Sequence, residues 1–458
     1  SLLGSRLIFR FSLTDYQEMS RVTAQWQRLA ERAIRIGDAL PAEDQDAYYQ
    51  LVRYPVTASA NLYALREAEF TNIRYASQGR AATNDLADIA EARFADDKAM
   101  SDYYNTTLAG GKWQGFQTQP KIGYGDVERY GPNAPWQQPE LNGQLLPDEI
   151  FPAVQRIEVP DTAELGVAID GSDAWWPAEP SPAVLPTFSP YQSQPAQYIE
   201  VFNRGSVPFD YRISPAVPWV TVDNAAGTVD KQVRATVHID WSQAPKGATA
   251  VPLTVTGAGA SVEVLAVVDN PEVVPAPGTF VEANGYVSMA ADHHSRVFDD
   301  DSVSWQRVPD LGRTGAGMEP FPVTVASRTP GGDGPRLEFD MHLTTTGPVR
   351  VWAYLSPRNN VLPTDGLKYA VSIDDGPPQI VNITTATGAD DTAMNRQWER
   401  NTSDNVNRTV TTHVITEPGT HVLKFWMVDP TVVLQNLVVD TGGLKPSYLG
   451  PPESLRAE

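Results

Sequence analysis

The chain has 458 residues, a formal net charge of −21 and no cysteine. The length allows two to four domains with sizeable cores, while the negative charge disfavours nucleic acid and anionic membrane surfaces as partners. The absence of cysteine excludes disulfides and thiolate metal sites, and no apolar run in the sequence is long enough to span a bilayer.

The N-terminal segment predicts helices, because apolar residues recur there at intervals of three and four. Thr14 and Gln17 have the spacing of a capping box, and Gly37 suits the left-handed residue that ends a helix. Pro55 should kink or restart the helix, because proline removes a backbone donor. The first predicted stripe consists of Tyr16, Met19, Val22, Trp26, Leu29, Ala33 and Ile36. We therefore expect an antiparallel helix bundle over residues 1–112.

Residues 1–6 lack the charged start and the small-residue cleavage site of a signal peptide, so we expect an internal or processed start. Residues 113–165 show little periodicity, and we expect a long ordered connecting loop there.

Short strands between turns follow that loop. The runs at 198–205, 219–222, 233–240 and 262–268 predict an immunoglobulin-like β-sandwich over residues 166–270. Three prolines make residues 271–278 a stiff linker. Further alternating strands predict a jelly-roll β-sandwich, the C-terminal module, over residues 279–458. The predicted fold class is therefore multidomain, α followed by all-β.

The segment at residues 434–454 reads LQNLVVDTGGLKPSYLGPPES. It closely resembles the C-terminal signature of glycoside hydrolase family 115, the xylan α-1,2-glucuronidases. Other segments match the same family in the right order, namely 285–288, 308–315, 365–375, 418–424 and 428–430, with 50–56, 59–62 and 110–113 in the helical part.

The resemblance implies an enzyme that releases (4-O-methyl)glucuronic acid from glucuronoxylan, or a related uronic-acid-bearing polysaccharide, by inverting hydrolysis. It implies that the catalytic acid and base lie in a barrel upstream of this chain, so that this chain alone is expected to be inactive. We also expect no cofactor, a homodimer, and an extracellular or periplasmic location.

Two positions depart from the family pattern. Ala290, Ala291 and Asp292 stand where we expect Glu-Ala-Glu, and Lys121 stands where the family tends to have histidine. The first departure weakens a carbohydrate or metal site in the C-terminal module. The second weakens a contribution of the 113–165 loop to a site.

The loop at residues 111–124 nevertheless holds the best candidate binding residues. Trp113 offers a ring face to a sugar, and Lys112 and Lys121 could offset a uronate carboxylate. Gln117 and Gln119 could bind hydroxyls. The full predicted substrate-binding set is Lys112, Trp113, Gln117, Gln119, Lys121 and Tyr124. The alternative is that the loop packs against an upstream domain and binds nothing.

Metal sites are weakly indicated. Asp292 and Asp440 are candidates for a shared structural cation by analogy with carbohydrate-binding modules of families 6 and 35, while Asp299-Asp300-Asp301 fits a solvated turn better than a calcium loop. His293 and His294, if on a strand, would point to opposite faces.

Aromatic residues 175–176 and Trp136 could form a sugar platform, although packing at a domain interface is the favoured interpretation.

The sequence is compatible with three functions. The first is the C-terminal portion of a xylan α-1,2-glucuronidase, whose catalytic residues are unknown and expected outside this chain. The second is a non-catalytic carbohydrate-binding or scaffold protein of the same ancestry. The third is an enzyme with both carboxylates inside the chain, among Asp126, Glu128, Asp299 and Glu319. It is the weakest, because no α/β-barrel pattern supports a rigid carboxylate pair.

Overall fold

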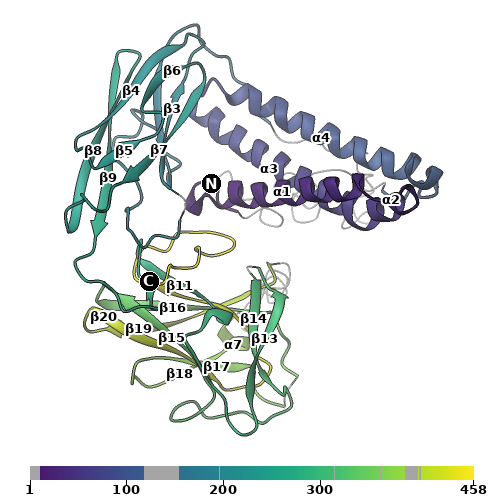
Figure 1. Ribbon diagram of the computed structural model, residues 1–458, viewed down its shortest axis with the longest axis vertical. Coiled ribbons are helices and arrows are strands. Elements are labelled where there is room, and N and C mark those ends of the chain that lie inside the picture. Colours follow the sequence, from purple (N-terminus) through teal and green to yellow (C-terminus); the bar gives the residue numbers. More distant parts are fainter. Residues whose placement is uncertain are drawn as a thin grey trace. The chain divides into compact units, whose positions relative to one another are not determined.

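The computed structural model describes residues 11–117, 154–194, 196–313, 315–361, 363–386, 401 and 404–458. The chain forms two compact units. The first comprises Ser1–Pro186, Pro195–Asp240 and Ala250–Ala266, and the second comprises Thr187–Gln194, Trp241–Thr249 and Val267–Glu458. Helices come first in the chain and are followed by β-sheets that form sandwiches (Figure 1). The coarse prediction of a helical part followed by β-sandwiches is therefore confirmed.

The helical part contains α1 (Glu18–Asp38), α2 (Ala42–Tyr48), α3 (Tyr54–Gln78) and α4 (Thr83–Thr106), with a π-helical turn at Tyr49–Arg53 and 3₁₀ turns at Asp15–Gln17 and Leu108–Gly111. Helix α3 packs against both α1 and α4. Pro55 lies in the first turn of α3, directly after the π-helical turn. The predicted restart at this proline is confirmed. Among the described residues, none of the helices is sufficiently long and apolar to cross a bilayer.

The predicted helix ends are wrong at the start and at Gly37. Gln17 has a positive φ of 48°, so α1 begins only at Glu18, and Thr14 makes no capping bond. The Ser12 hydroxyl accepts the Asp15 N–H instead, while the Ser12 N–H donates to the Glu18 carboxylate.

Helix α1 continues past Gly37 to Asp38. A Cβ at Gly37 would lie 3.0 Å from the Tyr48 ring, so this glycine permits a close approach rather than a helix stop. Two members of the predicted stripe, Leu29 and Ile36, are 45% and 43% exposed, so the apolar stripe is only partly buried.

The first β-sandwich consists of two sheets with strand orders β1-β3-β7-β5 and β2-β9-β8-β4-β6. The strands are β1 (Leu165–Ile169), β2 (Ala183–Val184), β3 (Tyr198–Asn203), β4 (Phe209–Pro215), β5 (Val220–Val222), β6 (Ala226–Val229), β7 (Gln232–Ile239), β8 (Gly247–Gly257) and β9 (Ala260–Asn270). Strands β3, β5, β7 and β9 were predicted from the sequence and are confirmed.

The C-terminal module has sheets ordered β10-β15-β20-β17-β18, with β12 beside β15, and β13-β14-β21-β16-β19, with β11 beside β21. The strands are β10 (Phe280–Val281), β11 (Tyr286–Ala290), β12 (Arg296–Phe298), β13 (Ser304–Leu311), β14 (Gly315–Phe321), β15 (Arg336–Leu343), β16 (Gly347–Leu355), β17 (Lys368–Ile373), β18 (Gln379–Asn382), β19 (Asn407–Ile415), β20 (Gly419–Met427) and β21 (Leu434–Asp440), with the short helices η4 (Ala291–His293) and α7 (Ile383–Ala386).

The core of this module lies between the two sheets. Alternate residues of β15 and β20, such as Phe339 and Phe425, are almost fully buried there. Period-two alternation of this kind is what the sequence predicted for strands with one face toward a core.

A buried arginine joins the helical part to the first sandwich. The Arg80 side chain, in the turn between α3 and α4, is fully buried, and its Nη1 lies 2.8 Å from Oε2 of Glu200 on β3. Its guanidinium lies 4.0 Å from the ring centre of Tyr75 and 4.1 Å from that of Phe202. Arg234 on β7 pairs with the other Glu200 oxygen at 2.8 Å. One carboxylate thus fixes two cations where helices and sheet meet.

We expect the Arg80→Met variant to lose about 3 kcal/mol of unfolding free energy, because removing one partner leaves a buried Glu200 with a single cation. Urea denaturation measures the loss, and Arg28→Met, at an exposed position of α1, is the matched control. Adding Glu200→Gln to Arg80→Met should recover part of the loss. A loss below about 1 kcal/mol would show that the pair does not hold the junction.

Candidate functional sites

The predicted loop site is described only as far as Gln117. Trp113 is half-buried and packs on the cluster of Tyr54, Tyr104 and Leu108. Lys112 is exposed, with its Nζ 5.0 Å from the centre of the Trp113 ring.

The backbone N–H and C=O of Gln117 both bond the Asn105 side chain, at 2.8 and 2.9 Å. The remaining predicted residues, Gln119, Lys121 and Tyr124, lie outside the described residues, as does Trp136. The substrate-binding role of the set stays a prediction.

The aromatic residue that the sequence interpretation overlooked in this loop is Phe116. It is 63% exposed and stacks on Tyr104, with ring centres 6.1 Å apart and planes at 17°. Trp113 meets Phe116 edge to face at 5.6 Å. The structure therefore gives Trp113 a packing contact and leaves Phe116 as the more accessible ring.

Substitution distinguishes the packing contact of Trp113 from the exposed ring of Phe116. We expect Trp113→Ala to lower the free energy of unfolding by about 2 to 3 kcal/mol, because it empties a packed position. Phe116→Ala should cost less than about 1 kcal/mol, because most of the ring is already in water. Thermal unfolding of both variants measures this difference, and equal losses would contradict it.

The aromatic residues at 175–176 pack within the protein. Trp176 is 7% exposed, and its Nε1 donates to the Ser181 carbonyl at 2.6 Å. The Trp175 ring meets Phe202 edge to face at 6.0 Å, and Arg204 lies over it at 4.4 Å. Packing, the favoured interpretation, fits these contacts better than a sugar platform.

The two metal candidates are not brought together. In the β11–β21 pair Asp440 faces Tyr286 and Ala290 faces Asn436, so Asp292 lies beyond the opposite end from Asp440. Calcium ligands must lie 2.3–2.6 Å from one ion. Asp440 instead pairs with Arg350 at 2.6 Å, and Asp292 pairs with Arg307 at 2.8 Å. No set of three or more histidine and carboxylate residues within the described ranges is placed to hold a metal ion.

The acidic run at 299–301 is a hydrogen-bonded turn. The Asp299 carboxylate accepts the Trp305 N–H at 2.9 Å, and Asp300 accepts the Ser302 N–H at 2.7 Å. Bonds from Ser302 and Arg328 lower the pKa of Asp300 to about 2. Backbone donors and the Arg328 guanidinium thus offset the charge of these carboxylates.

His293 is the last residue of η4 and His294 follows it, so neither lies on a strand and the condition for the expected opposite faces is not met. Both line a cavity of about 540 Å³, together with Glu453 and Arg456. His293 Nδ1 lies 2.9 Å from a Glu453 carboxylate oxygen, and His294 Nδ1 lies 3.1 Å from the Ala291 carbonyl oxygen.

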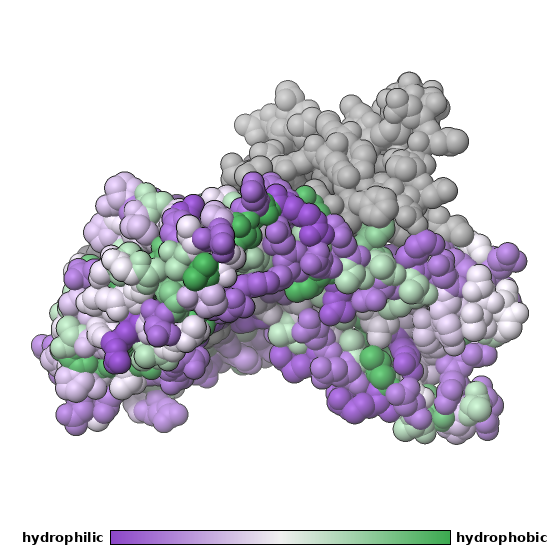
Figure 2. Space-filling model, turned by 90° about the horizontal axis from the view of Figure 1, so that it is seen from above, coloured by the Kyte–Doolittle hydropathy of each residue, from purple (hydrophilic) through white to green (hydrophobic). Residues whose placement is uncertain are grey.

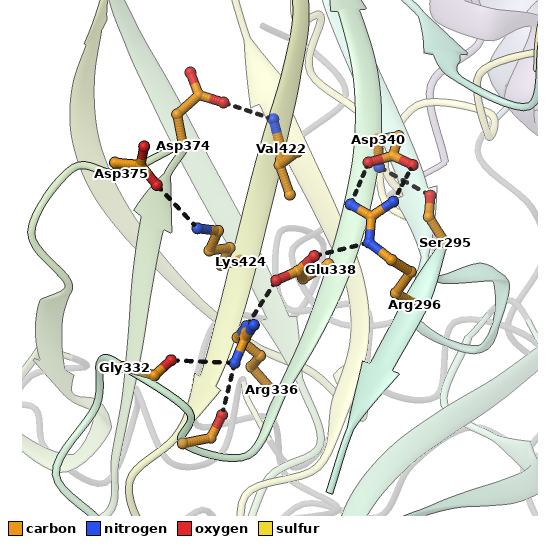
Figure 3. Close-up of polar contacts among 11 residues, drawn as sticks. Ser295, Arg296, Gly332, Arg336, Glu338, Asp340, Asp374, Asp375, Val422 and Lys424 are labelled. Atoms are coloured by element: carbon orange, nitrogen blue, oxygen red, sulfur yellow. Dashed lines mark hydrogen bonds and ion pairs between the residues drawn. The ribbon is translucent and has the colours of Figure 1, made fainter.

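A ladder of charges covers the outer face of the sheet that contains β15 (Figure 3). Arg296 pairs with Glu338 at 2.9 Å and with Asp340 at 2.6 Å, while Arg336 holds the second Glu338 oxygen at 2.7 Å. Because each carboxylate already has a cationic partner, we interpret this ladder as stabilising the sheet rather than binding a ligand.

A better candidate for a ligand-binding site is a cavity in the first unit. We call it the helix–strand pocket, a cavity of about 310 Å³ lined by residues of α1, α3, α4, β3 and β7. Its charged residues are Glu67, Arg74, Arg93, Glu200 and Arg234. Helices α3 and α4 run toward the strands β3 and β7 in Figure 1. The surface shown in Figure 2 is mostly hydrophilic, with small separate hydrophobic groups.

The sequence interpretation missed this pocket, although one signal was present. Glu67, Thr71 and Arg74 recur at three- and four-residue spacing on α3, among the small residues Ala64 and Ala68. Polar residues at the spacing of one helix face indicate a polar lining where a core would be apolar.

Asp170, at the end of β1, is another buried carboxyl in this unit. It is 5% exposed; Gln17 donates to its Oδ2 at 3.0 Å, and its Oδ1 has no hydrogen-bond partner. Burial raises the pKa of Asp170 to about 6. Between its unfolded pKa of about 4 and 6, the folded chain holds a proton that the unfolded chain releases, so this group makes stability fall as pH rises.

We expect the advantage of Asp170→Asn over the unsubstituted chain to grow by about 2 kcal/mol between pH 4 and pH 7.5, because asparagine does not ionise. Urea denaturation at both pH values measures it. Asp46→Asn, at an exposed position of α2, should show no such trend. A constant difference would contradict the raised pKa.

The comparisons with known proteins concern mainly the C-terminal module. Residues 279–453 match the family model of the glycosyl hydrolase family 115 C-terminal domain. The chain carries a family 115 C-terminal domain. The resemblance found in the sequence is thereby confirmed for this module. No curated protein sequence matches the chain.

Solved structures with the same kinds of elements include a family GH115 4-O-methyl-α-glucuronidase described as specific for decorated arabinogalactans. It shows 13% identity and a TM-score of 0.46, and the match covers 95% of this chain and 34% of that chain. This chain therefore spans about a third of that protein's length. Two carbohydrate-binding modules also match. One is a family 35 module from Clostridium thermocellum, with 11% identity and a TM-score of 0.23, covering 34% of this chain and 96% of that chain. The other is a family 6 module of Cellvibrio mixtus lichenase 5A in complex with cellotriose, with 12% identity and a TM-score of 0.22, covering 34% of this chain and 95% of that chain.

Proposed function

We propose that this chain is the C-terminal portion of a xylan α-1,2-glucuronidase that releases (4-O-methyl)glucuronic acid from glucuronoxylan by inverting hydrolysis. The observation that carries the proposal is the family 115 C-terminal domain at residues 279–453. The ordered sequence matches in the helical part support its extension to the N-terminal unit.

We place the catalytic acid and base in a barrel that precedes this chain. An inverting pair needs two carboxyl groups about 6.5–9.5 Å apart across a cleft. Of the carboxylates considered inside the chain, Asp299 accepts a backbone N–H and Glu319 approaches Arg358 at 3.4 Å, while Asp126 and Glu128 lie outside the described residues. The engagement of Asp299 and Glu319 in other contacts supports the upstream assignment.

Within the enzyme, this chain would support the catalytic barrel and contribute to a homodimer. We assign an immunoglobulin-like topology to the first sandwich and a jelly roll to the C-terminal module. Exposed apolar side chains on the helical part support an interface there: Leu51 is 75% exposed, Phe116 63% and Leu29 45%. Light scattering would show twice the monomer mass if the dimer forms through this chain.

We also propose an extracellular or periplasmic location. Glucuronoxylan is a polymer, and hydrolysis of a polymer that does not enter the cell requires an enzyme outside the cytoplasm. Cell fractionation with an antibody against the C-terminal module tests the location.

The activity is tested by comparing the complete gene product with this chain alone on glucuronoxylan. We expect uronic acid release by the complete product and none above buffer by residues 1–458, because the acid and base are supplied from upstream. NMR of the first product should show the inverted anomer. Release by residues 1–458 would place both carboxylates inside this chain.

The alternative is a non-catalytic carbohydrate-binding or scaffold protein. It predicts that the complete product binds xylan without releasing uronic acid. Affinity electrophoresis in gels with and without glucuronoxylan distinguishes the two outcomes.

A further inference from the structure

We propose that the helix–strand pocket binds a small sugar acid, a single pyranose that carries a carboxylate. The proposal rests on the proposed function only for the source of this ligand, which would be the sugar acid released by the enzyme. The pocket itself is formed entirely within the first unit.

The size and walls of the pocket suit a monosaccharide. Its volume of about 310 Å³ falls at the lower end of the range for small-molecule sites. Ala64 and Ala68 of α3 and Ile89 of α4 present short aliphatic surfaces, which suit the apolar face of a pyranose. Gln27 and Thr71 add amide and hydroxyl groups that can bond sugar hydroxyls.

Arginines supply the carboxylate recognition. Arg93 reaches Asp96 only at 3.4 Å, and its side chain is 43% exposed. Arg234 uses its Nε and Nη2 for Glu200, and its side chain is 51% exposed. A planar guanidinium binds a carboxylate through two parallel hydrogen bonds, so both cations can accept a ligand anion from the pocket side.

The two carboxyls of the pocket do not cancel this charge. Glu200 is already compensated by Arg80 and Arg234, each at 2.8 Å. Burial raises the pKa of Glu67, which favours its neutral form. The Glu67 carboxyl can accept hydrogen bonds from sugar hydroxyls. The lining holds three arginines, Arg74, Arg93 and Arg234, against the two carboxyls, so the pocket has an excess of positive charge in a chain whose net charge is −21.

A neutral sugar and a simple anion each satisfy only half of these groups. Glucose would bring no carboxylate to the arginines of the pocket, and acetate would leave the amide and hydroxyl groups unused. The structure therefore predicts a preference for a ligand that carries both a carboxylate and hydroxyl groups. D-glucuronate is the probe for this preference.

Isothermal titration calorimetry of residues 1–458 with D-glucuronate, D-glucose and acetate tests the proposal. We expect glucuronate to bind at least about tenfold more tightly than either other ligand. Arg93→Gln should weaken glucuronate binding about tenfold by removing a charge-assisted bond, and Ala64→Leu should abolish it by filling the pocket. Arg32→Gln, which removes the same charge from an exposed position of α1, is the matched control and should bind as the unsubstituted chain does. Thermal unfolding confirms that each variant is folded.

The proposal is overturned if glucuronate does not bind, if glucose or acetate binds equally well, or if Arg93→Gln and Ala64→Leu both bind as the control does. Binding is measured without hydrolysis, so a complete product that proves inactive on xylan would refute the proposed function and leave this result standing. Conversely, if the complete product hydrolyses xylan but glucuronate does not bind in the helix–strand pocket, only the proposal about the pocket is refuted.

Discussion

The first unit depends on one buried carboxylate that is held by two arginines. Glu200 lies on β3, and its oxygens reach Arg80 from the α3–α4 turn and Arg234 from β7. Burying ions is costly unless each charge is paired, so these three residues tolerate few other arrangements of helices against the sheet. The rings of Tyr75 and Phe202 on either side of Arg80 exclude water from the pair and add cation–π attraction. The same pairing positions Arg234 in the lining of the helix–strand pocket.

The C-terminal module is stabilised by the segment that carries the family signature. All residues of β21 are buried, although a strand in a two-sheet sandwich normally shows one face to solvent. After β21 the chain returns beside β11, where the Ser288 N–H donates to the Ser454 hydroxyl and the Ser454 N–H donates to the Ser288 carbonyl, both at 2.9 Å. The last residues of the signature thus pack beside β11. A sequence match there reports on packing in the module as much as on chemistry.

Charge is arranged differently in the two units. In the C-terminal module the arginines at 296 and 336 form salt bridges with carboxylates on the same face of the sheet. In the helix–strand pocket some guanidinium groups remain accessible, while the pKa of Glu67 is raised. The proposed sugar acid would need local positive charge of this kind, because the overall negative field of the chain repels anions.

Much of the fold follows from the sequence alone. Strand β15 is an example, because its alternating apolar residues record which face lies toward the core. The restart of helix α3 at Pro55 follows from the covalent chemistry of proline. Family membership of the C-terminal module could likewise be inferred from short motifs in their order.

Only the tertiary structure decided what the polar groups do. Trp113, the best sequence candidate for a sugar platform, packs on the helical part, and Asp292 and Asp440 are separated by strand register. The pocket residues Glu67, Arg93 and Arg234 are far apart in the sequence and meet only when helices and sheet pack together. Periodicity encodes whether a residue faces inward, but the partner of a charge is set by contacts between distant segments, which no local pattern specifies.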